Sequence, residues 1–210
     1  MKKIVFTFAL GLGLLTANAQ IQSLAGPRLG LVYISASPGS VFLNGDIQLE
    51  ELGELPENYN DIAKGTFTSL YGWQWESRFA DGGNVTGIVE WIAVVGGMEK
   101  GKFLPSVSSM VGARTASGIE FAVGPNLSLS GIAMVFGMGY NFKSGRLNIP
   151  INIAFIPGRK LSQSIEADID YNWINPATDQ YEDKVISEAY TIDYNSGNRV
   201  SITVGFNLSK

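Results

Sequence analysis

The fold is decided by one stretch in the second half of the chain, Gly131-Ile132-Ala133-Met134-Val135-Phe136-Gly137-Met138-Gly139-Tyr140-Asn141-Phe142. Large apolar side chains occupy every second position, and small or polar residues fill most positions between them. A repeat of two residues is typical of a β-strand whose two faces meet different surroundings. The same alternation recurs in residues 28–33, 71–76, 85–93, 147–155 and 199–208. The sequence therefore predicts an all-β fold.

The alternating segments, and the turn residues between them, predict about eight antiparallel strands. The strands are expected at residues 28–36, 66–80, 85–96, 106–114, 118–124, 128–143, 146–157 and 198–209. Alternate connections are short, at 81–84, 115–117 and 143–145. The others are a tight turn at 124–126 and longer segments at 38–65, 97–105 and 157–197. Short periplasmic turns and longer external loops are the rule for outer-membrane β-barrels.

The longest connection contains two further extended segments, 165–173 and 185–194. They form either a hairpin that continues the neighbouring strands, or two more strands of the sheet, which would make about ten. In the second segment Glu188 shares a face with Ile186 and Tyr190. Because a charge on a lipid-facing surface is costly, we favour eight strands.

The direction of the apolar face separates a membrane protein from a soluble one. In a soluble lipocalin-like barrel the apolar face lines the cavity, and the opposite face meets water and carries many charges. Here the opposite face carries mainly Gly, Ala, Asn, Ser and Thr, which suits a narrow interior. We therefore expect the apolar face to meet lipid, and a secreted, soluble lipid binder is the alternative. The lipid-facing aromatic residues would be Tyr71, Trp73, Trp75, Trp91, Tyr140 and Phe206.

The N-terminal residues predict export. Lys2 and Lys3 precede an apolar stretch from Ile4 to Leu15, and Ala17-Asn18-Ala19 has small residues at the two positions that a signal peptidase reads. The apolar stretch is too short to span a membrane as a helix. We therefore expect a signal peptide at residues 1–19 and one outer-membrane β-barrel domain at residues 20–210.

The composition argues against most catalytic and nucleic-acid-binding functions. The 210 residues include no Cys and no His, which excludes a thiolate metal site and removes the commonest general base. A formal net charge of -4 disfavours nucleic acid as a partner. The 25 Gly and the 11% aromatic residues favour a small barrel. We expect no enzymatic activity, no cofactor and no metal site.

Charged residues on the small, polar face form one candidate cluster. Its members are Arg28, Glu76, Arg78, Glu90, Arg114 and Glu120. Because buried charges must pair, we expect ion pairs that block the interior of the barrel. The catalytic alternative is a hydrolase that relies on Glu76, Glu90 and Glu120 alone, and it would need a substrate cleft beside them.

The two longest connections are acidic. Residues 38–65 contain six carboxylates against Lys64 alone, and residues 157–197 contain eight against three basic residues. Within the second, Asp168-x-Asp170-x-Asn172 resembles the start of a calcium loop, but Trp173 replaces the glycine needed at the sixth position. Strand alternation already explains the spacing. These loops are either solvated surface or a docking surface for a basic partner or divalent cations.

Three segments carry a resemblance to a known group of proteins. They are Gly118-Ile119-Glu120-Phe121-Ala122-Val123-Gly124-Pro125-Asn126-Leu127-Ser128, Lys143-Ser144-Gly145-Arg146-Leu147-Asn148-Ile149-Pro150-Ile151-Asn152 and Arg199-Val200-Ser201-Ile202-Thr203-Val204-Gly205-Phe206-Asn207. Together they resemble small outer-membrane β-barrel proteins of Bacteroidota. The resemblance implies a fold and a location but no activity. One departure is that Phe206 is followed by four more residues, whereas such barrels often end in an aromatic residue.

These observations predict a non-enzymatic outer-membrane protein with a structural or surface-interaction role through its acidic external loops, 38–65 and 157–197. Its partners would be outer-membrane lipid and another outer-membrane or surface protein. A narrow pore, or an accessory subunit of a transport or secretion complex, is the alternative within the membrane. Conductance across a planar bilayer would separate the two.

Overall fold

The computed structural model describes residues 23–48, 52, 54–175 and 180–209, so the predicted signal peptide lies outside the described residues. Most of the described chain is β-strand, and its strand pairs are antiparallel, as predicted. The main sheet consists of β1 (Ser23–Ile34), β2 (Thr66–Asp81), β3 (Val85–Gly96), β4 (Leu104–Thr115), β5 (Ile119–Ser128), β6 (Gly131–Ser144), β7 (Leu147–Ile156), β12 (Arg199–Gly205) and β13 (Asn207–Ser209). In the described part of the chain no helix is long and apolar enough to cross a membrane.

The main sheet closes on itself into a ring. Each strand from β1 to β7 pairs with the next one in the chain, and β12 pairs with both β7 and β1. β13 continues β12 beyond Phe206, whose backbone N–H donates to the Pro27 carbonyl at 3.0 Å. β12 and β13 together therefore complete a ring of eight strands, which confirms the predicted number.

The predicted tight turn at 124–126 is wrong. Residues 124–126 lie inside β5, which ends at Ser128, and the chain reverses at Leu129 and Ser130 instead. The glycine with a positive φ, which such a reversal favours, is Gly131 at +94°, whereas Gly124 has extended backbone. Gly124 serves a close approach, because a Cβ at this position would lie 1.9 Å from the Ser109 carbonyl oxygen of β4.

The two faces of the ring differ as the alternation of the sequence requires. Large apolar side chains project outward and are exposed on every strand, whereas the buried side chains of the interior are mostly Arg, Glu, Gln, Asn and Thr. The ring also has two different ends. The short-turn end carries the connections at 82–84, 116–118 and 145–146, and the long-loop end carries all the longer connections.

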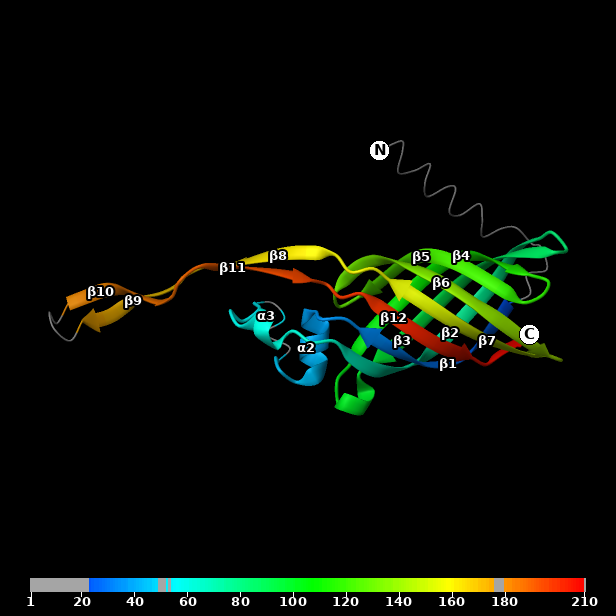
Figure 1. The fold of residues 1–210 in the computed structure, drawn as a ribbon, viewed down its shortest axis with the longest axis horizontal. Helices are drawn as coiled ribbons and strands as arrows, with labels where there is room; N and C mark the ends of the chain where they lie inside the picture. Colours follow the sequence, from blue (N-terminus) through cyan, green and yellow to red (C-terminus); the bar gives the residue numbers. More distant parts are fainter. Residues whose placement is uncertain (1–22, 49–51, 53, 176–179, 210) are drawn as a thin grey trace, which may run out of the picture.

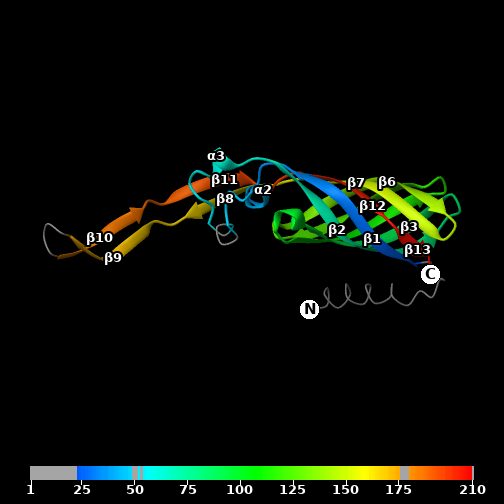
Figure 2. The same cartoon turned by 90° about the horizontal axis from the view of Figure 1, so that it is seen from below.

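An arm of two short sheets leaves the long-loop end of the ring. It consists of β8 (Lys160–Ile165), β9 (Asp168–Asn175), β10 (Gln180–Ser187) and β11 (Tyr190–Asn195). β8 pairs with β11 and β9 with β10, and among the described residues none of the four pairs with the ring. Figures 1 and 2 show the arm as a narrow ribbon that projects away from the ring. The hairpin interpretation therefore holds, and the ten-stranded alternative is wrong.

The connection between β1 and β2 forms a cap at the long-loop end that the sequence analysis missed. It contains α2 (Pro38–Asn44) and α3 (Tyr59–Ile62). α2 starts with a capping box, in which the side chains of Ser37 and Ser40 each accept a hydrogen bond from the backbone N–H of the other residue. The pattern Ser37-Pro38-Gly39-Ser40, followed by apolar residues, is a sequence signal that could have revealed this helix.

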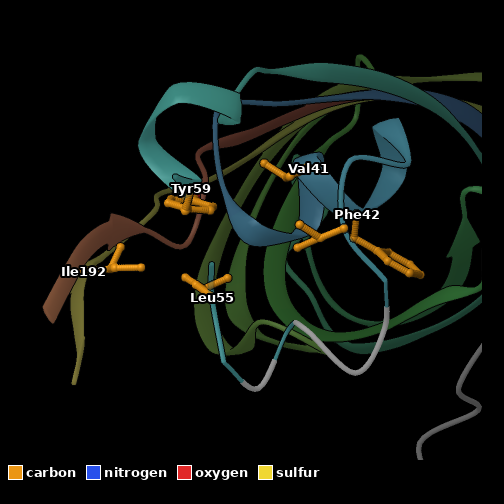
Figure 3. Packing of buried hydrophobic residues seen from close by; sticks show 6 residues of the cluster. Val41, Phe42, Leu55, Tyr59 and Ile192 are labelled. Carbon is orange, nitrogen blue, oxygen red and sulfur yellow. The ribbon is translucent and has the colours of Figure 1, made fainter. Parts of the chain in front are cut away.

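The cap packs against the base of the arm. An apolar cluster joins the cap to β11. It contains Val41 and Phe42 of α2, Leu55, Tyr59 and Ile192 of β11. Figure 3 shows Leu55, Tyr59 and Ile192 gathered beside the mouth of the ring. Two hydrogen bonds reinforce the contact: the Leu55 N–H donates to Gln163 Oε1 at 3.2 Å, and the Tyr190 hydroxyl donates to the Leu55 carbonyl at 3.1 Å. The arm is thus held at its base by the cap.

Candidate functional site

The interior of the ring toward the short-turn end holds a buried group of ion pairs. Arg114 of β4 donates from Nη1 to Glu76 Oε1 at 2.7 Å and from Nη2 to Glu76 Oε2 at 2.5 Å. Its Nε also donates to Glu120 of β5. One guanidinium therefore joins carboxylates from strands on both sides of it in a two-point geometry that only arginine offers.

A second chain of hydrogen bonds crosses the same region. Arg28 of β1 donates to Gln74, and the Gln74 amide donates to Glu90 Oε1 at 2.6 Å. Arg28 Nε donates to Thr203 Oγ1 at 2.9 Å. The Asn152 amide fits best with its oxygen toward Arg28 Nη2 at 3.1 Å. Each side of the Arg28 guanidinium therefore has an acceptor inside the ring.

The structure buries five of the six predicted cluster residues in the ring interior, and it adds one residue that the sequence analysis missed. Arg28, Glu76, Glu90, Arg114 and Glu120 are all buried in the ring interior. The sixth, Arg78, is half-buried farther along β2. The missed residue is Gln74, which is fully buried and links Arg28 to Glu90. Its place on the polar face of an alternating segment was the available signal.

A chamber of about 300 Å³ occupies the interior toward the long-loop end. Arg28, Asn152 and Thr203 lie at its inner end, beside the ion pairs. Its walls are largely apolar and its outer end is rich in hydroxyl groups. The apolar wall residues include Val32, Leu70, Ile92, Val94, Met110 and Val135, and the hydroxyl residues of the outer part include Ser37, Ser128, Ser130, Ser196 and Ser201. The three buried glutamates do not line this chamber.

Arg199, the first residue of β12, stands at the outer end of the chamber. It pairs in register with Ile34 and Ile156, the last residues of β1 and β7. Its Nη1 donates to Ser128 Oγ at 3.0 Å, and its buried Nε has no hydrogen-bond partner among the residues that the structure describes. In the described part of the chain no carboxylate forms an ion pair with it. Arg199 begins the last alternating segment of the sequence, 199–208, and the alternation alone predicted no role for it.

The six aromatic residues predicted to meet lipid lie on the outer surface. Tyr71, Trp73 and Trp75 follow one another on β2, and Trp91 is paired with Trp75 on β3. All six side chains, including Tyr140 and Phe206, are between 41% and 52% exposed. In water such a set would be costly to leave uncovered.

Two titratable groups at the long-loop end have shifted pKa values. Burial, together with the neighbouring Tyr194, raises the pKa of Tyr59 to about 12. Glu99 lies in η2 (Met98–Lys100), between β3 and β4. The slight burial of its carboxylate acts to raise the pKa, but hydrogen bonds from the hydroxyls of Ser69 and Thr68 and from the Ser69 N–H outweigh it and lower the pKa to about 2.

The possible calcium loop lies in the arm. Asp168 and Asp170 belong to β9, so their spacing follows from strand alternation. Among the residues that the structure describes, no group of three His, Cys, Asp or Glu side chains is placed to hold a metal ion. Asp179, which stands at the twelfth position of this possible loop in place of the usual Glu, lies outside the described residues. A comparison of the chain with protein-family models and with curated proteins found no match.

Proposed function

We propose that the chain is a non-enzymatic β-barrel of the outer membrane that holds its arm outside the cell as a docking element for a protein with a basic surface. The outer face of the ring supports the membrane assignment. It exposes large apolar side chains on every strand, such as Trp91 at 52% and Ile202 at 50%. A closed sheet satisfies its backbone polar groups internally, so lipid can cover this face without penalty.

The two ends of the ring support an orientation. Outer-membrane barrels keep short turns in the periplasm and longer loops outside. With that orientation the cap and the arm both lie outside the cell, and the buried ion pairs lie toward the periplasm. Inside the ring, hydrogen bonds join buried Arg114 to Glu76 and Glu120, and buried Arg28 to Gln74. Such paired groups favour a closed barrel over a pore.

The observation that carries the proposal is the arm itself. A ribbon of two strands buries little, yet this one projects from the ring and is anchored at its base by the cap. Beyond the base it exposes apolar side chains at Tyr171, Ile174, Val185 and Ile186. Exposed carboxylates flank the joint between its two sheets: Glu166, Asp168 and Glu188. Apolar anchors beside acidic groups fit a partner with a basic rim around an apolar pocket.

Orientation is tested on intact cells. Protease added outside should cut within the connection 157–197, because it is long and projects from the ring. Cutting confined to the turn at 81–84 would invert the orientation and remove the arm from the cell surface.

Docking is tested by site-specific crosslinking. A photo-reactive residue at Ile186 should trap one partner protein, and the triple substitution Glu166→Gln, Asp168→Asn and Glu188→Gln should abolish that product. The matched control removes three exposed carboxylates from the cap instead, at Asp46, Glu54 and Asp61. If the control abolishes crosslinking equally, general charge attracts the partner and the arm is not the docking element.

A further inference from the structure

The formally charged residues that line the chamber are all cationic. Two of the residues that line it, Arg28 and Arg199, carry a formal positive charge, and none of its described lining residues is Asp or Glu. A cavity with only cationic groups favours a negatively charged ligand, because its low-dielectric walls strengthen the attraction.

The two arginines differ in how many of their guanidinium N–H groups are already hydrogen-bonded within the protein. Arg28 already donates to Thr203, Gln74 and Asn152, and the glutamates of the ion-pair group lie close enough to act on its charge. Among the described residues, the side chain of Arg199 bonds only to the Ser128 hydroxyl, and its buried Nε has no partner. A buried, unpaired guanidinium nitrogen is costly unless an anion completes it. The anion site is therefore at the outer end, at Arg199.

Hydroxyl groups lie around this position. Ser128 contacts Arg199, and Ser37, Ser130 and Ser196 also line the chamber. Ser201 lies two residues deeper on β12, in register with Val32. A carboxylate can accept hydrogen bonds from such hydroxyls while it pairs with the guanidinium. Deeper in the chamber most of the wall is apolar, from Val32 and Leu70 to Ile92 and Met110. Ser106, Ser108 and Asn126 interrupt it on the β4 and β5 side. A ligand that fits both parts has a charged head and an apolar tail.

We propose that the chamber binds a small amphipathic monocarboxylate, with its head on Arg199 and its tail along the apolar walls. The chamber volume of about 300 Å³ is at the small end for ligand pockets, which suits an unbranched chain of about ten carbons. Because the buried ion pairs close the inner end, the chamber holds such a molecule and does not pass it through. Leu161 and Tyr194, at the base of the arm, also line the chamber, but decanoate binding does not require a docking partner, so either proposal can fail alone.

Titration of the purified full chain in neutral maltoside detergent tests the site, with decanoate labelled with ¹³C at its carboxyl carbon as the probe and empty micelles subtracted. The wild-type chain should show saturable binding. Arg199→Gln should weaken decanoate binding by about tenfold or more, because it removes a charge-assisted contact. Binding of decanol, which has no charge, should change by less than about threefold.

Three further variants separate recognition of the carboxylate head from loss of the fold. Arg199→Lys keeps the charge and should retain most of the decanoate affinity, and Arg159→Gln, on the same end but outside the chamber, should retain all of it. Ala154→Trp should fill the chamber and abolish binding of both probes. The proposal is overturned if binding is not saturable, if Arg199→Gln binds decanoate as tightly as the wild type, or if Arg159→Gln loses as much affinity as Arg199→Gln.

Discussion

The ring and the arm are built from the same kind of strand, yet they handle strand edges and side chains in opposite ways. In the ring every strand has two neighbours, and the charged side chains of Arg114, Glu76 and Glu120 are buried and paired inside. In the arm each strand pairs with only one other, and the described acidic side chains at the joint are exposed. The difference shows that charged side chains are buried where the sheet closes into a ring and stay exposed where only two strands pair.

Removing a buried charge from the ring should have the largest effect. Arg114→Gln leaves Glu76 and Glu120 buried without their cation, which should cost about 3–5 kcal/mol of the free energy of unfolding. The measurement is the urea midpoint in detergent, with Lys143→Gln, at an exposed position near the short turns, as the control. Adding Glu120→Gln to Arg114→Gln should recover part of the loss. A midpoint equal to that of the wild type would mean that the ion pairs contribute nothing to closure.

A charge placed on the apolar exterior of the ring should be tolerated less well than the same charge placed on the arm. Ile202→Arg puts a cation on the outer face of β12, where lipid contact would make it cost about 2–4 kcal/mol at the membrane midplane. Val185→Arg makes the same change at a 54% exposed position of the arm and should be tolerated. The fraction of chain that assembles in lipid vesicles measures both. Equal tolerance of the two substitutions would show that the outer face of the ring meets water.

The close approach of β4 and β5 at Gly124 predicts that one added methyl group lowers the stability of the ring. Gly124→Ala would place a Cβ 1.9 Å from the Ser109 carbonyl oxygen, so β4 and β5 must separate locally, at a cost of about 1–3 kcal/mol. Gly137→Ala, on the neighbouring strand, would meet nothing closer than 3.6 Å and should be neutral. The shift in urea midpoint for each variant is the measurement. If both variants are neutral, the strands at Gly124 can separate without cost.

The smallest expected effect is a pH dependence at the long-loop end. The pKa of Glu99 is about 2 in the folded chain, below its unfolded value. Its contribution to stability is therefore complete above an unfolded pKa of about 4.3 and is lost as the pH falls toward about 2. Because the side chain is exposed, the effect should be small. In Glu99→Gln the difference between the urea midpoints at pH 6 and pH 3 should shrink, and an unchanged difference would assign the pH dependence to other carboxylates.

Much of the ring could be predicted from the sequence because period-two alternation reports directly which face of a strand is buried. Even the Ser-rich segment at 106–114 is a ring strand, β4. The turn at 124–126 was misplaced because Gly, Pro and Asn favour turns locally, whereas here Gly124 is needed for close strand contact. Asn126, which the prediction placed in that turn, is buried in the ring and donates to Ser106 and Ser108 at 2.6 and 2.9 Å.

The candidate sites were predictable only in part. Alternation placed Arg114, Glu76 and Glu120 on one face, and the need to pair buried charges brought them together. The chamber could not be predicted, because a cavity depends on how side chains from many strands fill the interior, which no single segment records. The role suggested for Arg199 rests on an unpaired nitrogen that becomes visible only when its neighbours are placed.

The pairing of β1 with β12 also governs how the chain can fold. The hydrogen bond from Arg28 to Thr203 joins residues 175 positions apart, so the ring closes only after nearly all of its strands have been synthesised. Until then both closing strands present open edges that could join other chains and aggregate. Long-range closure is also slow, because the loop entropy is lost before the contacts form. We therefore expect transport of the unfolded chain to require a holding chaperone, and amide protection of β1 and β12 to appear last during refolding, as pulse-labelled hydrogen exchange would measure.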